Sequence, residues 1–185
     1  MLPCRGGPAR RRVRLRRDQR NADQDGHRDG YAAGFASTSI AGLLRAIAVL
    51  TTDLRLTVGA ANGAAGTIFY PLDFTNASSS ACTMYGYPGV AFVSSPGGSQ
   101  VGAPAGRGSV APTLITLSPG ATAHATLAVS DVLIANNCLD DQVQVSWVQV
   151  YPPDQYSALS APLSRQGCAD RSLVTMHVST ASSGS

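Results

Sequence analysis

Polar and apolar residues alternate along residues 66–75, which is the pattern of a half-buried β-strand. One face of this strand would carry Ile68, Tyr70, Leu72 and Phe74, and the other would carry Thr67, Phe69, Pro71 and Asp73. The polar run 76–80 has turn composition and precedes a second strand-like run at residues 81–85. Together the two runs predict an antiparallel hairpin.

Short apolar runs separated by Gly, Pro, Ser and Asn continue from residue 53 onward. We expect strands at residues 54–58, 66–75, 81–85, 90–94, 113–117, 121–130, 142–151 and 172–178. We expect turns at residues 95–98, 118–120 and 151–154, and an irregular loop at 103–112. This spacing is typical of an all-β, immunoglobulin-like antiparallel β-sandwich of seven to eight strands. The alternation along residues 142–151 places Trp147 in its core.

Composition supports a β fold and divides the chain into two parts. The sequence contains no Lys and no Glu, which fits a GC-rich genome, and it is rich in strand-forming Val and Thr. Residues 1–30 hold nine Arg against four Asp, a balance of +5, whereas the remaining five Arg and seven Asp give −2. Because the globular part is mildly acidic, we expect no nucleic-acid partner for it.

We expect three segments along the chain. Residues 1–38 are predicted to be a disordered Arg-rich arm, because they have almost no periodic apolar residues. Residues 39–50 form a short apolar segment that could make a helix of three turns, and residues 51–180 form the sandwich. A nucleic-acid or membrane-binding tail and an export signal are alternatives for the arm, but the apolar stretch after it is short and interrupted by Arg45. We expect that the sequence upstream of about Thr51 is not the natural N-terminus.

Five motifs in order support a family resemblance. They are DLRLTVG at 53–59, GAAGTIFYPLDFTN at 63–76, CTMYGYPGV at 82–90, LSPGATA at 117–123 and VQVYPPD at 148–154. This set resembles an actinobacterial family of secreted proteins and lipoproteins that carry an immunoglobulin-like domain of unknown function. The resemblance covers about residues 51–178. It implies secretion or association with the cell envelope, although the chain has no convincing signal peptide, and it carries over no established activity.

The resemblance also implies a disulfide between Cys138 and Cys168, which match two cysteines common near the C-terminal end of the family. Such a bridge would close a ring of about 30 residues and contribute roughly 3 to 4 kcal/mol. Family members commonly carry another Cys just before the first strand, where this chain has Leu50, Thr51 and Thr52. Cys82 therefore lacks the partner implied by the family. It could reach Cys4 only through the arm, so we expect a partly buried thiol.

Other chemical signatures are weak. There is no C-x-x-C pair and only three His, so a zinc site is not expected. Cys168, Met176 and His177 lack the spacing of a copper site, and we expect His177 and His124 to be strand residues, with His124 facing solvent. The chain has neither a G-x-S-x-G elbow nor a signature of paired carboxylates. We expect no catalytic residue, no metal and no cofactor.

Four tyrosines on Gly- and Pro-shaped loops are the candidate binding residues: Tyr85, Tyr87, Tyr151 and Tyr156. Tyrosines in such loops give rigid contact area at low entropic cost. Alternatively, one Tyr hydroxyl caps a loop as in a tyrosine corner, and the Pro residues only end strands. We expect a monomeric, non-catalytic, exported module without a transmembrane segment that contacts an envelope protein or glycan.

The alternative function is a small secreted hydrolase or ligand-sequestering domain whose site is built from loops. A His beside an acidic residue in a cleft would favour the enzyme.

Overall fold

The computed structural model of the protein describes residues 47, 48, 50–131, 138 and 140–184. Within these ranges the regular structure is β-strand, apart from one 3-10 turn at Thr51–Asp53, so the predicted all-β class is confirmed. None of the helical structure seen in the described residues is long and apolar enough to cross a membrane. The predicted arm at 1–38 and Cys4 lie outside the described residues. In the 39–50 segment, Ile47–Ala48 form a strand rather than the predicted helix.

Fourteen strands occur in the described part of the chain. They are β1 (Ile47–Ala48), β2 (Leu54–Val58), β3 (Asn62–Ala64), β4 (Thr67–Asn76), β5 (Cys82–Tyr85), β6 (Gly89–Val93), β7 (Gln100–Val101), β8 (Gly106–Arg107), β9 (Leu114–Leu117), β10 (Thr122–Ser130), β11 (Gln142–Tyr151), β12 (Leu159–Cys168), β13 (Met176–Val178) and β14 (Ser182–Ser183). The predicted strands agree to within one residue, except that the last one begins only at Met176. The ten-residue strand β12 was not predicted. Its sequence contains Pro162 and Gly167, which weaken the strand signal but are tolerated at a sheet edge.

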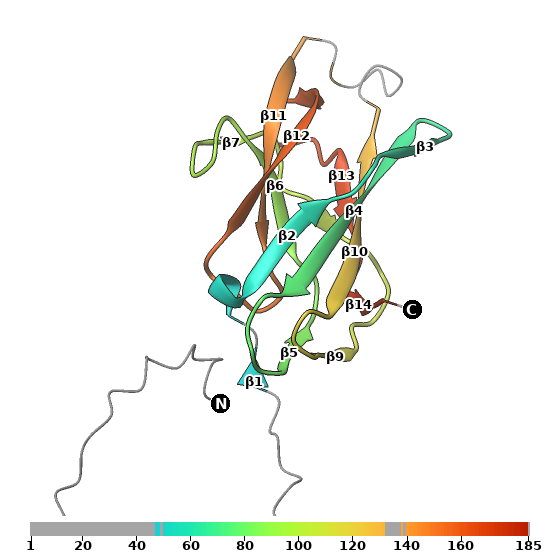
Figure 1. The fold of residues 1–185 in the computed structure, drawn as a ribbon. Coiled ribbons are helices and arrows are strands. Elements are labelled where there is room, and N and C mark those ends of the chain that lie inside the picture. The colour runs from blue at the N-terminus through green and yellow to red at the C-terminus, as the bar shows by residue number, and fades with distance from the viewer. Residues whose placement is uncertain (1–46, 49, 132–137, 139, 185) are drawn as a thin grey trace, which may run out of the picture. The chain divides into compact units, whose positions relative to one another are not determined.

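The strands form two larger sheets and one small one. One sheet has the order β2-β4-β10-β13-β8, with β3 pairing with β4 and β14 pairing with β10. The second has the order β12-β11-β6-β7, and the small sheet has the order β1-β5-β9. Figure 1 shows β2, β4 and β10 as one layer and β6, β11 and β12 as another.

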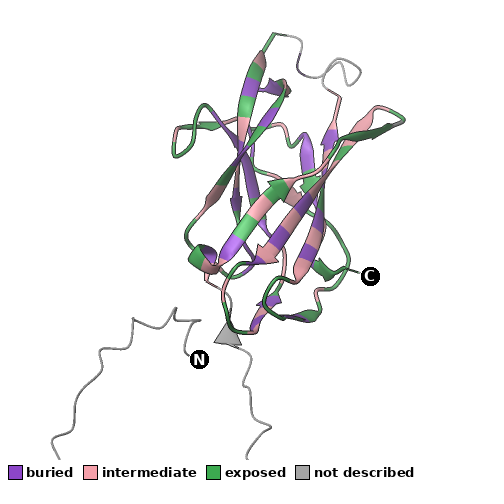
Figure 2. Ribbon diagram, viewed as in Figure 1, coloured by how far each residue is buried: buried purple, intermediate pink, exposed green. Residues whose placement is uncertain are grey.

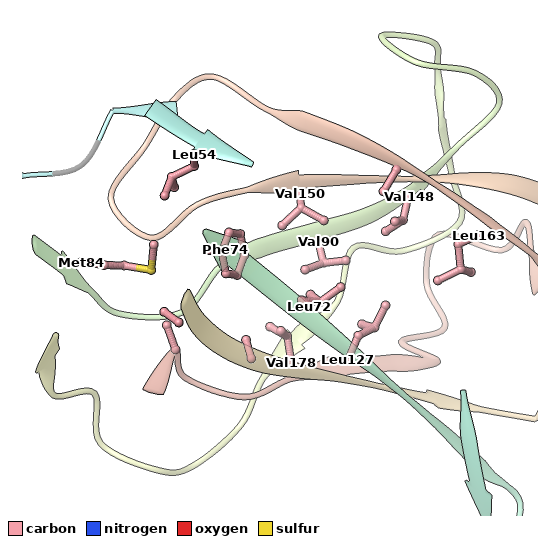
Figure 3. Close-up of a cluster of buried hydrophobic side chains, with 14 of the residues drawn as sticks. Leu54, Leu72, Phe74, Met84, Val90, Leu127, Val148, Val150, Leu163 and Val178 are labelled. Carbon is pink, nitrogen blue, oxygen red and sulfur yellow. The ribbon is translucent and has the colours of Figure 1, made fainter. Parts of the chain in front are cut away.

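The hydrophobic core lies between the two larger sheets. Leu72 and Phe74 of β4 are completely buried, and Val148 and Val150 of β11 are completely buried from the other sheet. Figure 2 shows buried positions alternating with less buried ones along β4 and β10, as period-2 strands require. In Figure 3, Leu72, Leu127, Val90 and Val148 converge in this space. The prediction that Leu72 and Phe74 lie on the inner face of β4 is therefore confirmed.

The hairpin predicted between residues 66–75 and 81–85 is wrong. β4 pairs with β2, β3 and β10, whereas β5 pairs with β9 and β1 in a different sheet. The reason lies in the connecting turn. The buried side chain of Asn76 donates from Nδ2 to the carbonyls of Ser80 (2.9 Å) and Leu117 (3.0 Å), and its Oδ1 accepts from the Ser78 amide (3.0 Å). This network leads the chain out of the first sheet instead of reversing it.

The predicted burial of Trp147 is also wrong. The pairing of β11 with β12 is irregular between Val145 and Trp147, which marks a β-bulge. A bulge inserts one residue and so changes which side chains face the core. Val145 is buried before the bulge, Val148 and Val150 are buried after it, and Trp147 is only half-buried.

Candidate functional site

Three of the four predicted tyrosines line one open groove. Tyr87 lies in the loop between β5 and β6, Tyr151 ends β11, and Tyr156 lies in the loop after it; the three surround a volume of about 280 Å³. The remaining lining residues are Gly89, Arg107, Pro152, Asp154 and Gln155. Three separate stretches of the chain, at residues 87–89, at Arg107 and at residues 151–156, therefore meet at this groove. We call it the tyrosine groove.

The end of β11 supplies one wall of the groove. Tyr151 is the last residue of the strand, and Pro152 and Pro153 follow it, neither of which has an amide to continue the sheet pairing. The chain then turns, because the Gln155 amide donates to the Pro152 carbonyl (3.1 Å). Asp154 occupies this turn with a φ of 58°, a left-handed conformation that Asp tolerates better than most residues. The turn presents Tyr156 with 96% of its surface exposed.

Gly89 keeps the flank of Tyr151 open. The two residues are directly opposite in the pairing of β6 with β11. A β-carbon at position 89 would lie 3.7 Å from the Tyr151 ring, so a larger side chain there would pack against that ring. Glycine here leaves Tyr151 37% exposed toward the groove.

Tyr87 has a structural role in addition to lining the groove. Its hydroxyl donates to the carbonyl of Gly108 (2.8 Å) and also contacts the carbonyl of Val110. The guanidinium carbon of Arg107 lies 5.9 Å from the centre of the Tyr87 ring, within cation–π range. The loop-capping tyrosine considered as an alternative is thus realised by Tyr87, whereas Tyr151 and Tyr156 remain exposed.

Tyr85 does not line the tyrosine groove. It ends β5, directly opposite Leu114 of β9, and the two side chains are 54% and 69% exposed. Gly86 follows with a φ of 120°, which turns the chain so that only Tyr87 enters the groove. The structure thus separates Tyr85 from the other three candidates.

Sequence reasoning missed Arg107 as a member of the site. It lies in the 103–112 stretch predicted to be irregular, but Gly106–Arg107 forms β8 and pairs with β13 in parallel. The pairing of β8 with β13 places the Arg107 backbone beside the groove, and its guanidinium lies over the ring of Tyr87. No local signal marked it, because the pairing joins residues about 70 positions apart in the sequence.

His124 makes a side-chain contact with a carboxylate that the sequence did not predict. It faces partly outward from β10, with 45% of its side chain exposed, and its Nδ1 lies 2.7 Å from Oδ1 of Asp73 on the neighbouring strand β4. The Ser182 hydroxyl donates to the backbone carbonyl of His124 (3.3 Å), not to its ring. Neither His124 nor Asp73 lines the tyrosine groove.

The C-terminal residues considered for copper do not converge. Met176 is buried and His177 is exposed, on opposite faces of β13, and Cys168 is bonded to Cys138. The disulfide implied by the resemblance is therefore confirmed. Cys82 is fully buried in the core rather than partly buried. Within the described ranges, no three His, Cys or acidic residues gather closely enough to hold a metal ion.

One carboxyl group near the disulfide has a shifted pKa. The backbone amide and hydroxyl of Ser172 both donate to Oδ1 of Asp170 at 2.8 Å. These hydrogen bonds stabilise the charged form and lower the pKa of Asp170 below its ordinary value of 3.8. The same two hydrogen bonds close the exposed turn that follows Cys168.

Comparison with known proteins places the domain in one family. The profile of the family described as Domain of unknown function (DUF4232) matches residues 50–182, which span all of the strands described above except β1 and the last residue of β14. No curated protein and no solved structure matches the chain significantly. Because the match covers well over half of the sequence, the chain belongs to the DUF4232 family of domains of unknown function.

Proposed function

We propose that this protein is an exported, non-catalytic binding module that contacts a protein or glycan of the cell envelope through the tyrosine groove. The observation that carries the proposal is the convergence of Tyr151 and Tyr156 with Arg107 at one open surface. Tyrosine and arginine are the residue types enriched in binding interfaces. The Tyr87 ring favours one orientation of the Arg107 guanidinium, which reduces the freedom that Arg107 loses on binding.

Export is supported by the disulfide between Cys138 and Cys168. Disulfides persist in oxidising compartments and are rare in the reducing cytosol. The family resemblance in the five sequence motifs and the composition without Lys or Glu support an actinobacterial source. These observations together favour secretion or attachment at the envelope.

The strand order supports an immunoglobulin-like classification. In such sandwiches the first, second and fifth strands share one sheet, and the third, sixth and seventh share the other. Here β2, β4 and β10 are neighbours in one sheet, while β6, β11 and β12 are neighbours in the other. In this arrangement the tyrosine groove lies among loops, where immunoglobulin-like domains present their contact residues.

A secreted hydrolase is the second candidate, and the contact between His124 and Asp73 favours it. A carboxylate that orients an imidazole is one part of a hydrolytic triad. The geometry opposes this function in two ways. Neither residue of the pair lines the groove, and no described hydroxyl group bonds to the His124 ring.

The test of the proposed function is binding of the purified full chain to isolated envelope material. Sedimentation with the envelopes should deplete the wild-type protein from solution, and Tyr156→Ala should reduce the depletion. Tyr85→Ala is the matched control, because Tyr85 is an exposed tyrosine outside the groove. Equal depletion of the wild type and Tyr156→Ala would contradict the proposal. Mass spectrometry of the protein recovered from the medium and envelope tests export and defines the mature N-terminus.

A further inference from the structure

The polar groups of the tyrosine groove are of opposite charge and are available to a ligand. Among the described residues, no group donates a hydrogen bond to the carboxylate of Asp154, and the guanidinium of Arg107 forms no hydrogen bond or ion pair and lies over the Tyr87 ring. The Gln155 side-chain NH₂ donates to the backbone carbonyl of Asp154 (3.0 Å), and the Gln155 side-chain oxygen remains able to accept a hydrogen bond. The groove therefore offers strong acceptors and strong donors within one small volume.

This combination suits a ligand without net charge that both donates and accepts hydrogen bonds. The charges of Arg107 and Asp154 cancel, so an anion would meet the carboxylate and a cation would meet the guanidinium. A hydroxyl group donates one hydrogen bond and accepts others, so adjacent hydroxyls can satisfy both residues at once. Sugar rings carry such hydroxyls.

The aromatic side chains of the groove suit the apolar C–H face of a sugar ring. Tyr156 is 96% exposed and Tyr151 is 37% exposed, so both rings offer apolar surface to a ligand. The C–H face of a pyranose can cover such a ring while its hydroxyls turn toward the polar residues. The volume of about 280 Å³ lies just below the usual range for drug-sized ligands, so the groove would hold one or two units of a longer chain.

A proline-rich peptide is the main competitor, because such segments also dock on aromatic grooves. Proline has no amide hydrogen, so a run of prolines has nothing to donate to Asp154. Binding it would strip water from this carboxylate without replacing the lost hydrogen bonds, which is costly. The groove chemistry therefore favours sugar over polyproline.

We infer that the tyrosine groove binds a neutral polysaccharide, one or two sugar residues at a time. This inference rests on the proposed function and specifies the ligand class for the same site. Tyr151 and Tyr156 stack on the sugar rings, and Asp154, Arg107 and Gln155 bond their hydroxyls.

Isothermal titration of the full chain tests the inference. The probes are short oligomers of glucose, mannose, galactose and arabinose, with galacturonate oligomers and a proline decamer as competitors. At least one neutral oligomer should bind, and Tyr156→Ala and Asp154→Asn should each weaken its binding by about tenfold. Asn is chosen because it removes the charge and tolerates the positive φ of residue 154. Tyr85→Ala should leave the affinity unchanged.

Three results would overturn the inference. The first is the absence of any heat of binding with the neutral oligomers at millimolar concentration. The second is preferential binding of the proline decamer or of galacturonate. Neutral-sugar binding that survives Tyr156→Ala would move the site elsewhere. If envelope binding depends on Tyr156 while no neutral sugar binds, the proposed function stands and the sugar assignment fails. If envelope binding is also indifferent to Tyr156, both fail.

Discussion

Removing the disulfide between Cys138 and Cys168 should destabilise the domain strongly. The two cysteines are 30 positions apart, and the ring they close contains the hairpin of β11 and β12. Both are buried, at 4% and 3% exposure, and pack against Leu173. The double substitution Cys138→Ala and Cys168→Ala removes the covalent link while keeping small apolar side chains at both positions.

The magnitude follows from the size of the ring. Closing about 30 residues removes about 12 cal/mol/K of entropy from the unfolded chain, which is about 3.6 kcal/mol at 25 °C. A domain of about 130 residues unfolds with an entropy of about 270 cal/mol/K, so the melting temperature should fall by about 13 °C. The loss is a large share of the roughly 5 to 15 kcal/mol that stabilises a typical domain.

Differential scanning calorimetry of the full chain measures this loss. The wild type should melt lower in the presence of a reductant, by an amount close to the effect of the double substitution. The doubly substituted protein is the control, because a reductant has no bridge to open in it and should leave its melting temperature unchanged. A double variant that melts within about 3 °C of the wild type would refute the reasoning from ring closure.

Three further predictions concern turns and buried polar groups. Gly102 and Gly97 have positive φ values of 68° and 70°, but only at Gly102 would an added methyl overlap a carbonyl oxygen of β12. In urea unfolding, Gly97→Ala should lower the free energy of unfolding by about 1 kcal/mol, and Gly102→Ala should lower it by about 1 to 3 kcal/mol more. Equal losses for the two variants would contradict the packing around Gly102. Asn76→Ala should cost about 2 to 4 kcal/mol in the same assay, because its buried amide bonds two carbonyls, and a loss below about 1 kcal/mol would argue against that network. The pKa of Asp170 is lowered on folding, so the stabilisation by its charged carboxylate is present above the ordinary pKa of 3.8 and is lost as the pH falls through the lower pKa of the folded state. The NMR signal of the Ser172 amide should therefore titrate with a midpoint below 3.8. A midpoint at or above 3.8 would be inconsistent with the hydrogen bonds from Ser172 to Asp170.

The strands were predictable where alternation alone determines them. β2, β4 and β10 follow a strict period of two, and their ends were found to within one residue. Trp147 was misplaced because a bulge in β11 shifts the alternation, and a bulge leaves no sure mark in the sequence. The partner of β5 was misjudged because a turn sequence does not reveal whether the chain reverses within one sheet or crosses to another.

The site was predictable only in its local parts. Tyr87, Tyr151 and Tyr156 stand out because each lies close to Gly or Pro, in a loop or at the end of a strand. Arg107 enters the groove through a pairing with a distant strand, and the contact of His124 with Asp73 joins residues 51 positions apart. Such long-range contacts depend on the sheet order, which the spacing of strands does not determine.

The most direct test of binding through the tyrosine groove is NMR mapping on the full chain labelled with ¹⁵N. Envelope glycan, solubilised and separated from protein, is titrated into the sample while the backbone amides are followed. The largest shifts should fall at the amides of Tyr151, Asp154, Gln155 and Tyr156 and at Arg107, with small changes at Tyr85. Shifts concentrated around Asp73 and His124, with the groove residues unmoved, would contradict the assignment of the groove as the binding site.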